Sequence, residues 1–230
     1  VYIPMKSSIS IYNSEFWLFD LDNTLYPASN GLMADVSSRM TKFVSNKLNI
    51  PRDAALTEQK ELYRKFGTTL SGLMKKYKVD PHDFLDFVHE VDYTIVQPDP
   101  RLSELLENLP GRKLVYTNAS ANHAEQVIKR LQITDQFEGI YDIAAAEWHP
   151  KPVQESYQTL IEKYDINPKS AVMVEDIAIN LQPAALMGMT TVWINHLEED
   201  PPIWTIPITG SDYVHHEINN LNNWLNSFIL

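Results

Sequence analysis

FWLFDLDNTLYP, residues 16–27, is the stretch from which the fold can be argued. Its first four residues are apolar and mostly aromatic, which predicts a buried β-strand. Side chains alternate along a strand, so Asp20 and Asp22 leave its end on the same face. Ligands bind beyond the carboxyl ends of strands in open α/β sheets, and two carboxylates there need a cation or a proton to neutralise them. The pair suits a nucleophilic, metal-binding carboxylate beside a proton carrier, although a solvated acidic turn gives the same short pattern.

The composition is that of a globular protein with a sizeable core: of 230 residues, 44% are hydrophobic and 21% are charged. The chain has no cysteine, which excludes disulfides, thiolate zinc sites and a cysteine nucleophile. No apolar run approaches the roughly 18 residues of a membrane span, and no signal peptide is evident. We therefore expect a cytoplasmic protein without a membrane partner.

The net charge of −11 argues against a nucleic-acid polymer as partner, because such binders usually present a basic face. The charge is uneven along the chain. Residues 27–98 hold 10 Lys and Arg against 9 Asp and Glu, whereas the rest holds 9 against 21. The shift indicates two parts with different roles, and it means that a phosphate site needs local donors and a metal. Nothing in the sequence indicates the oligomeric state.

Periodicity divides the chain into a helical insertion and an alternating α/β part. Apolar residues recur at helical spacing between residues 32 and 93, with one break predicted between Gly67 and Gly72. Afterwards, strands are predicted at 113–116, 140–144, 170–174 and 190–194. Helices are predicted at 102–109, 122–131, 153–164 and 215–230, and another follows Asp176 and ends at Met187. Asn122 and Glu125 are predicted to form a capping box at the start of the 122–131 helix. We therefore predict a Rossmann-like parallel sheet core from residues 1–26 and 97–230, with an α-helical cap formed by residues 27–96. Residues 197–210 are predicted to be an irregular loop of unassigned role.

Reactive side chains follow the predicted core strands. Asp20 and Asp22 end the first strand, Thr117 and Asn118 end the second, and Glu175 and Asp176 end the fourth, while Lys151 precedes a helix. Parallel strands bring their carboxyl ends to one edge of the sheet, so these residues converge. Phosphoryl transfer needs such a set: a nucleophile, donors for the phosphate oxygens, and a cation to keep clustered acids from repelling one another. Mg²⁺ suits that demand, because it prefers a few carboxylates together with phosphate oxygen and water.

Together, the four motifs resemble the haloacid dehalogenase superfamily of aspartate-nucleophile phosphatases. The resemblance covers residues 16–194: DLDNT matches the first motif, Thr117 the second, Lys151 the third and Glu175-Asp176 the fourth. The helical insertion looks like the C1 cap of that superfamily. At finer grain, the stretches FDLDNTLYP, FGTTLSGL, VYTNASANHA, FEGIYD and LMGMTTV resemble the pyrimidine 5′-nucleotidase branch.

The resemblance implies roles for the acidic residues. Asp20 attacks phosphorus and forms an aspartyl-phosphate. Asp22 protonates the leaving alcohol, then deprotonates the hydrolytic water, and its backbone carbonyl binds Mg²⁺. Asp176 binds Mg²⁺, and Glu175 binds it directly or through water. Many relatives carry Asp-Asp in the fourth motif, so Glu175 is a departure from the pattern.

The resemblance also implies roles for polar and basic residues. Thr117 and the backbone of Asn118 hold phosphate oxygens, and Lys151 offsets the charge on Asp20 and the phosphoryl group. Thr24 steadies the first loop, and Asn180 orients the acidic pair.

Each motif also has a plainer interpretation. Lys151 alone could be a solvated lysine at a helix start, Thr117-Asn118 a turn that leads into a helix, and Glu175-Asp176 an acidic helix start favoured by the helix dipole. The isolated histidines are interpreted as structural or cap-edge residues: His89, His123 and His149.

Choice of leaving group must come from elements that close over the phosphate. We expect substrate contacts from Tyr26 and from the segment 67–73, where Thr68 and Thr69 offer hydroxyls to a base or ribose. An ordinary interhelical turn is the alternative for that segment.

The leading prediction is a Mg²⁺-dependent phosphomonoesterase that hydrolyses nucleoside 5′-monophosphates, with UMP and CMP favoured. A dehalogenase of the same superfamily would not need Asp22. Phosphatases for sugar phosphates, phosphoglycolate or lysophosphatidate remain open, as does a phosphomutase. A non-enzymatic binding protein is disfavoured by the intact set of motifs.

Overall fold

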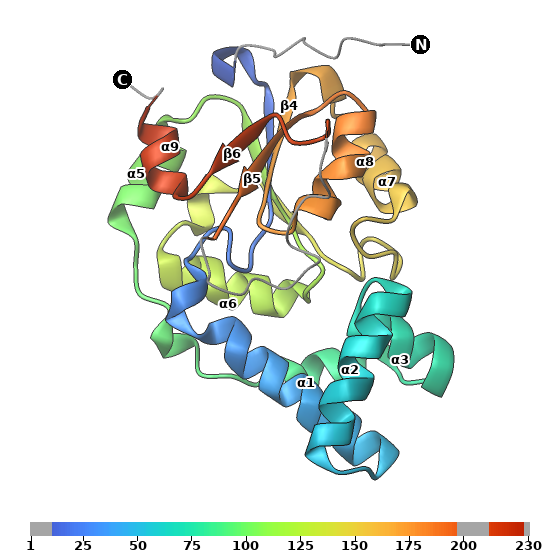
Figure 1. Ribbon diagram of the computed structural model, residues 1–230. Helices are drawn as coiled ribbons and strands as arrows, with labels where there is room; N and C mark the ends of the chain where they lie inside the picture. Colours follow the sequence, from blue (N-terminus) through green and yellow to red (C-terminus); the bar gives the residue numbers. More distant parts are fainter. Residues whose placement is uncertain (1–10, 197–211, 228–230) are drawn as a thin grey trace.

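The computed structural model describes residues 11–196 and 212–227, and at its centre lies a parallel sheet in the order β3-β2-β1-β4-β5-β6 (Figure 1). The strands are β1 (Phe16–Phe19), β2 (Arg112–Tyr116), β3 (Gly139–Tyr141), β4 (Ala171–Glu175), β5 (Thr190–Ile194) and β6 (His216–Ile218). The first strand is therefore central, with β2 on one side and β4 on the other. The chain has the predicted α/β fold with a parallel, Rossmann-like sheet.

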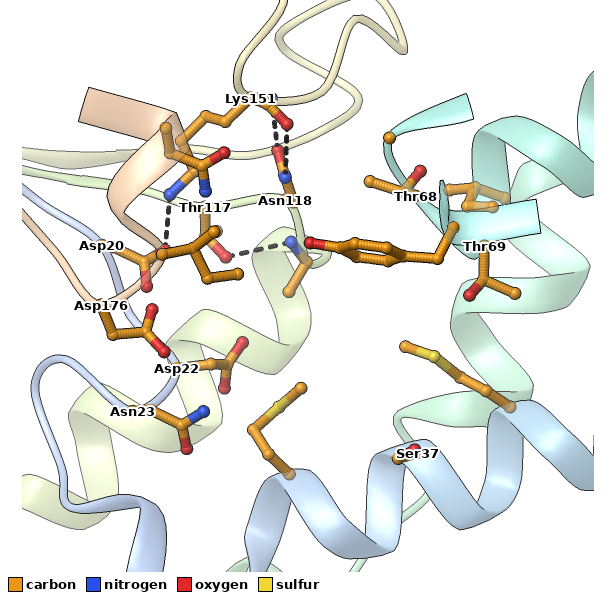
Figure 2. Close-up of a pocket in the computed structure, with 18 of the residues that line it drawn as sticks. Asp20, Asp22, Asn23, Ser37, Thr68, Thr69, Thr117, Asn118, Lys151 and Asp176 are labelled. Atoms are coloured by element: carbon orange, nitrogen blue, oxygen red, sulfur yellow. Dashed lines mark hydrogen bonds and ion pairs between the residues drawn. The ribbon is translucent and has the colours of Figure 1, made fainter. Parts of the chain in front are cut away.

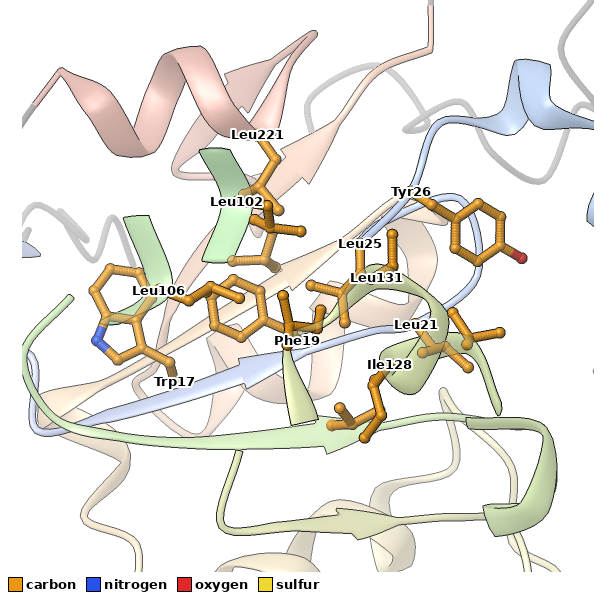
Figure 3. Close-up of a cluster of buried hydrophobic side chains, with 14 of the residues drawn as sticks. Trp17, Phe19, Leu21, Leu25, Tyr26, Leu102, Leu106, Ile128, Leu131 and Leu221 are labelled. Atoms are coloured by element: carbon orange, nitrogen blue, oxygen red, sulfur yellow. The ribbon is translucent and has the colours of Figure 1, made fainter. Parts of the chain in front are cut away.

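Helices cover both faces of the sheet because the strands are apolar on both sides. In β1, Trp17 and Phe19 belong to one apolar cluster, whereas Phe16 and Leu18 belong to the other. The first cluster is shown in Figure 3 and is covered by α5 (Pro100–Asn108), α6 (Ala121–Leu131) and α9 (Leu221–Asn226). The second cluster is covered by α7 (Gln154–Tyr164) and α8 (Leu181–Leu186). Burying each such large apolar side chain is worth about 1.5–3 kcal/mol, so the two clusters fix the strand register.

Four helices lie between β1 and α5 and have an apolar cluster of their own. They are α1 (Leu32–Leu48), α2 (Arg52–Phe66), α3 (Thr69–Tyr77) and α4 (Pro81–Val88). Asp80 caps α4 by accepting a hydrogen bond from the backbone N–H of His82, and Pro81 occupies the first turn. Figure 1 shows α1, α2 and α3 beyond one end of the sheet. The division into a core and a cap remains a prediction, and the separate apolar cluster of these four helices is consistent with it.

Short 3₁₀ helices complete the described elements: η1 (Ile11–Asn13), η2 (Ala28–Asn30), η3 (Tyr93–Ile95), η4 (Thr134–Gln136), η5 (Pro168–Ser170) and η6 (Ala178–Asn180). None of the helices within residues 11–196 and 212–227 combines the length and apolar character that crossing a bilayer requires.

The predicted break at residues 67–72 is shorter in the structure. Only Gly67 and Thr68 separate α2 from α3, and Gly72 lies inside α3. A Cβ atom at Gly72 would lie 2.7 Å from the Cβ of Leu62. Gly72 therefore allows α2 and α3 to approach each other, and it does not mark the end of a break as predicted.

The predicted last helix at 215–230 is wrong in its first part. Residues His216–Ile218 form β6, because they pair in parallel with β5, and α9 begins only after Asn220, whose side chain accepts from the N–H of Asn223. The strand predicted at 140–144 ends at Tyr141, since the Asp142 carboxylate turns the chain by accepting from the N–H groups of Ala121 and Ala145.

The cap predicted for the 122–131 helix is also wrong. Ser120 caps α6 by accepting from the N–H of His123, and Asn122 lies inside the helix. The irregular loop predicted at 197–210 lies outside the described residues.

Candidate active site

Three buried carboxylates meet where β1 and β4 end. Asp20 follows β1, Glu175 is the last residue of β4, and Asp176 follows it. Because β1 and β4 are neighbours in register, with Phe19 opposite Val174, the three side chains are brought together. One oxygen of each carboxylate lies within 4.8 Å of the others. The predicted convergence of the first and fourth motifs is therefore observed.

Lys151 provides the positive charge inside this cluster. Its Nζ donates hydrogen bonds to Asp20 Oδ1 at 2.6 Å, to Glu175 Oε2 at 2.9 Å and to the Tyr116 carbonyl at 2.9 Å. An ammonium group has three hydrogens, so all its donors are used and its position is fixed. Burial alone would lower the pKa of Lys151, but Asp20 and Glu175 outweigh burial and raise it above its ordinary value. The plainer interpretation of Lys151 as a solvated lysine is thus wrong, because its side chain is buried.

The carboxylates hold more negative charge than Lys151 can balance. Burial and the neighbouring Asp20 raise the pKa of Glu175 to about 7, and burial together with Glu175 and Asp20 raises the pKa of Asp176 well above its ordinary value. Asn23 adds an amide oxygen that is buried without a hydrogen-bond partner among the described residues. Oxygen-only donors around excess negative charge are the environment that Mg²⁺ prefers, so the residues present fit this ion.

Asp22 is held by two partners that the sequence analysis did not assign to it. Tyr26 donates its hydroxyl to Asp22 Oδ1 at 2.5 Å, and His123 Nε2 lies 2.8 Å from the same oxygen. Burial alone would raise the pKa of Asp22, but His123 and Tyr26 outweigh it and lower the pKa. Burial and Asp22 raise the pKa of Tyr26, which keeps its hydroxyl protonated and able to donate.

The remaining core residues support these groups. The amide of Asn118 accepts from the Lys151 N–H at 2.8 Å and donates to the Lys151 carbonyl at 3.2 Å. Thr24 Oγ1 donates to Asp20 Oδ2 at 3.3 Å, and Asn180 Nδ2 donates to Glu175 Oε1 at 2.5 Å. Asn180 thus contacts Glu175 of the acidic pair that it was predicted to orient, and Thr24, which was predicted to steady the first loop, contacts the Asp20 side chain.

Thr117, predicted to bind phosphate, lies at the end of β2 and lines the same cavity as Asp20. Its Oγ1 accepts from the Ala119 N–H at 3.0 Å.

A cavity of about 410 Å³ extends from the carboxylates towards the four inserted helices. Figure 2 shows Asp20, Asp22 and Asp176 on one side of it, facing Thr68 and Thr69 on the other. The inserted helices contribute mostly apolar or aromatic lining: Met33, Met40, Leu56, Tyr63, Leu70, Phe84, Leu85 and Val88. The site therefore combines a polar, charged end with a largely apolar end.

The residues predicted to read the leaving group are placed differently from one another. Thr69 is buried and lines the cavity. Thr68 also lines it, but its hydroxyl caps α3, accepting from the Ser71 N–H at 3.0 Å and donating to Ser71 Oγ at 2.9 Å. Tyr26 is bound to Asp22 and is not among the residues that line the cavity.

Sequence reasoning missed the link between His123 and Asp22. A signal was present, since His123 falls in the first turn of the helix after β2, at the edge of the sheet where Asp22 lies. The spacing of Asp22 and Tyr26, four residues apart, would also place them within reach if that turn is helical.

Comparisons with known proteins agree with this geometry. A family model described as haloacid dehalogenase-like hydrolase matches residues 17–194. The phosphate metabolism protein 8 of Saccharomyces cerevisiae is 30% identical over 202 residues, covering 80% of this chain. The chain spans only 62% of the length of that curated relative.

Solved structures share the fold at low sequence identity. The magnesium-bound HAD-hydrolase YfnB from Bacillus subtilis has a TM-score of 0.62 at 17% identity, covering 95% of this chain and 100% of YfnB. A HAD phosphatase from Thermococcus onnurineus has a TM-score of 0.62 at 20% identity, covering 93% and 97%. The L-2-haloacid dehalogenase from Xanthobacter autotrophicus has a TM-score of 0.58 at 12% identity, also covering 93% and 97%. Likeness at this level concerns the fold alone, and it includes both phosphatase and dehalogenase.

Proposed function

Because the chain belongs to the family of haloacid dehalogenase-like hydrolases, and is therefore an enzyme, we propose that it is a Mg²⁺-dependent phosphomonoesterase acting on nucleoside 5′-monophosphates. The observation that carries this proposal is Asp22. His123 and Tyr26 keep Asp22 ionised in the free protein, but the negative charge of a phosphate ester bound beside it raises its pKa, and the protonated carboxyl group can then give a proton to an alkoxide leaving group. Halide departure needs no such proton, so Asp22 favours a phosphatase over a dehalogenase.

The proposed reaction has two displacements on phosphorus. Asp20 attacks the phosphorus in line, the bond to the ester oxygen breaks, and Asp22 gives its proton to the departing alcohol. Water then attacks the aspartyl-phosphate, Asp22 takes a proton from that water, and the bond between Asp20 and phosphorus breaks to release phosphate. Lys151 holds Asp20 Oδ1, which fixes the nucleophile between the two steps.

The acidic cluster supports the proposed metal requirement. Asp20, Asp176 and the Asp22 backbone carbonyl would hold Mg²⁺, with Glu175 binding it directly or through water. When bound, the ion would supply positive charge to the non-bridging phosphate oxygens. Thr117 and the Asn118 backbone are proposed to hold the same oxygens from the other side.

The apolar end of the cavity supports a leaving group with a flat apolar part. A volume of about 410 Å³ lies within the range of roughly 300–1,000 Å³ usual for small-molecule sites. Its methionine, leucine and aromatic lining suits the face of a nucleobase, and Ser37, Gln59 and Lys60 on the same helices offer polar contacts to the edge of the base. The preference for pyrimidines rests on the resemblance described in the sequence analysis.

Phosphate release from a panel of esters, with Mg²⁺ and with a chelator, tests the proposal. The panel comprises UMP, CMP, AMP, GMP, a pentose phosphate, phosphoglycolate and a lysophosphatidate, and chloride release from 2-chloropropionate serves as the dehalogenase arm. Mg²⁺-dependent release favouring UMP and CMP is expected. Faster phosphate release from another ester would contradict the proposed substrate class. Chloride release without phosphate release would contradict the proposed phosphatase reaction.

A further inference from the structure

We propose that His123 is a positioning residue for Asp22: together with Tyr26 it fixes Asp22 Oδ1, so that Oδ2 carries the proton to the leaving group. The inference rests on the proposed function, because it assigns a partner to the group that protonates the alcohol. His123 was predicted to be structural, and its contact with Asp22 spans 101 positions of sequence.

Both hydrogen bonds of the Asp22 carboxylate go to one oxygen. Tyr26 donates to Oδ1 at 2.5 Å, and His123 Nε2 lies 2.8 Å from Oδ1. No hydrogen bond within the described part of the chain engages Oδ2, and Asp22 lines the cavity. A carboxyl group pinned through one oxygen cannot rotate freely, so its second oxygen keeps one direction while substrate is bound.

The ring of His123 is itself held in place. It is fully buried and stacks on His89, with ring centroids 4.3 Å apart. The Tyr93 hydroxyl lies 2.9 Å from the His89 carbonyl and 3.0 Å from His123 Nδ1, so it holds the Nδ1 side of the ring. Because the Asp22 carboxylate oxygen can only accept, Nε2 carries a hydrogen and donates it to Oδ1.

This arrangement differs from ordinary packing in one respect that can be measured. If His123 only filled space, a ring of similar shape would replace it without loss. If it positions Asp22, the nitrogen at the ε position is what matters. Gln places an amide nitrogen near that position, whereas Asn places one nearer the δ position and can reach only the Tyr93 side.

The test uses leaving groups of different basicity. The value of kcat/KM reports the steps up to formation of the aspartyl-phosphate, in which Asp22 acts as an acid. An alkoxide must be protonated as it leaves, but the weakly basic phenolate of p-nitrophenyl phosphate leaves without help. We expect His123→Phe to lower kcat/KM for the best nucleotide by about 100-fold, at the low end of general acid catalysis, and to leave p-nitrophenyl phosphate nearly unchanged.

The variants form a series. Asp22→Asn should give the same leaving-group dependence more strongly, His123→Gln should recover part of the nucleotide activity, and His123→Asn should not. The exposed His149→Phe is the matched control and should behave as the wild type. Melting temperatures identify any variant that fails to fold. If His123→Phe fails to fold, the comparison of His123→Gln with His123→Asn tests the positioning role instead.

The outcomes separate the two proposals. If the wild type hydrolyses no ester, the proposed function fails and this inference fails with it. If the wild type is active but His123→Phe lowers kcat/KM equally for the nucleotide and for p-nitrophenyl phosphate, or lowers neither, the proposed function stands and the positioning role is overturned. Equal recovery by Gln and Asn would also overturn it.

Discussion

Lys151 decides the charge balance of the site, because it is the partner shared by Asp20 and Glu175. Its side chain is only 1% exposed, so water cannot replace it. Removing one partner from a buried ion pair leaves an uncompensated charge, which costs more than the pair itself contributes.

Lys151→Met is therefore expected to abolish turnover and to lower the free energy of unfolding by about 3–5 kcal/mol. Denaturant unfolding and phosphate release are the measurements. Lys129→Met, at an exposed position of α6, is the control and should change neither. Normal stability in the Lys151 variant would mean that the two acids are protonated in the folded protein.

His89 makes stability depend on pH. Burial, helped by the neighbouring His123, lowers the pKa of His89 to about 3, against about 6.5 in an unfolded chain. The unfolded state then binds more protons between these values, so this contribution to stability is complete above pH 6.5 and is lost as pH falls towards 3.

The loss due to His89 is at most about 1.4 kcal/mol for each pH unit below 6.5. Between pH 7.5 and pH 5, the free energy of unfolding should fall by more in the wild type than in His89→Gln. The comparison of the two proteins isolates His89, because the acids with raised pKa values are common to both. Parallel pH profiles would contradict the assignment.

At the scale of elements, the close contact of α2 and α3 depends on Gly72. A Cβ there would lie 2.7 Å from atoms of Leu62. Gly72→Ala is expected to destabilise the protein by about 1–3 kcal/mol, measured by denaturant unfolding, as overpacked cores do. Alanine is a better helix former by about 1 kcal/mol, so the measured loss is a lower bound on the steric cost.

Gly67→Ala separates the steric effect from a backbone effect. Gly67 has φ +85°, and a Cβ atom at this position would have no neighbouring atom within 4 Å. Its substitution therefore costs only the strain of the left-handed conformation, about 1 kcal/mol. A Gly72 variant as stable as the wild type would show that α2 and α3 can move apart without loss.

Thr69 begins α3 and faces the carboxylates across the cavity (Figure 2). We expect Thr69→Ala to raise KM for a nucleotide while leaving hydrolysis of a small aryl phosphate nearly unchanged, because only the nucleotide reaches α3. Thr57→Ala, exposed on α2, is the matched control. An equal loss on both substrates would mean that Thr69 does not contact the leaving group.

The strand ends could be predicted from sequence, whereas the partners of side chains across the fold could not. Asp20, Thr117 and Glu175 each follow a short apolar run, and a local pattern fixes both the strand and its end. His216–Ile218 was mistaken for helix because an edge strand of three residues is defined by its neighbour, β5, and not by its own periodicity.

The same limit explains the missed contacts of the site. The bond between His123 and Asp22 joins residues 101 positions apart, and the packing of Gly72 depends on the distance between two helices. Neither the His123–Asp22 contact nor the separation of α2 and α3 can be derived from a local sequence pattern. Lys151 was assigned to Asp20 only because the resemblance supplied their pairing.

For the whole molecule, an acidic cluster with one lysine should make stability depend on Mg²⁺. A ligand at 100 times its dissociation constant adds about 2.7 kcal/mol to the free energy of unfolding. For a chain of 230 residues, we expect the melting temperature to rise by roughly 5–10 °C at saturating Mg²⁺.

Asp176→Asn should abolish most of that rise, whereas Asp135→Asn, at an exposed position, should preserve it. Differential scanning calorimetry with Mg²⁺ and with a chelator provides the measurement. A rise that persists in the Asp176 variant would place the ion elsewhere.

The central place of β1 has a consequence for biosynthesis. Phe16 pairs with Ala171, so one edge of β1 stays unpaired until β4 has been translated. Ribosomes add about 5–20 residues per second, so β1 emerges roughly 8–30 s before β4. During that interval the nascent chain presents an unpaired strand edge that can recruit other chains. Chaperone capture of the nascent chain, and aggregation of fragments that end before β4, follow from placing the first strand in the middle of the sheet.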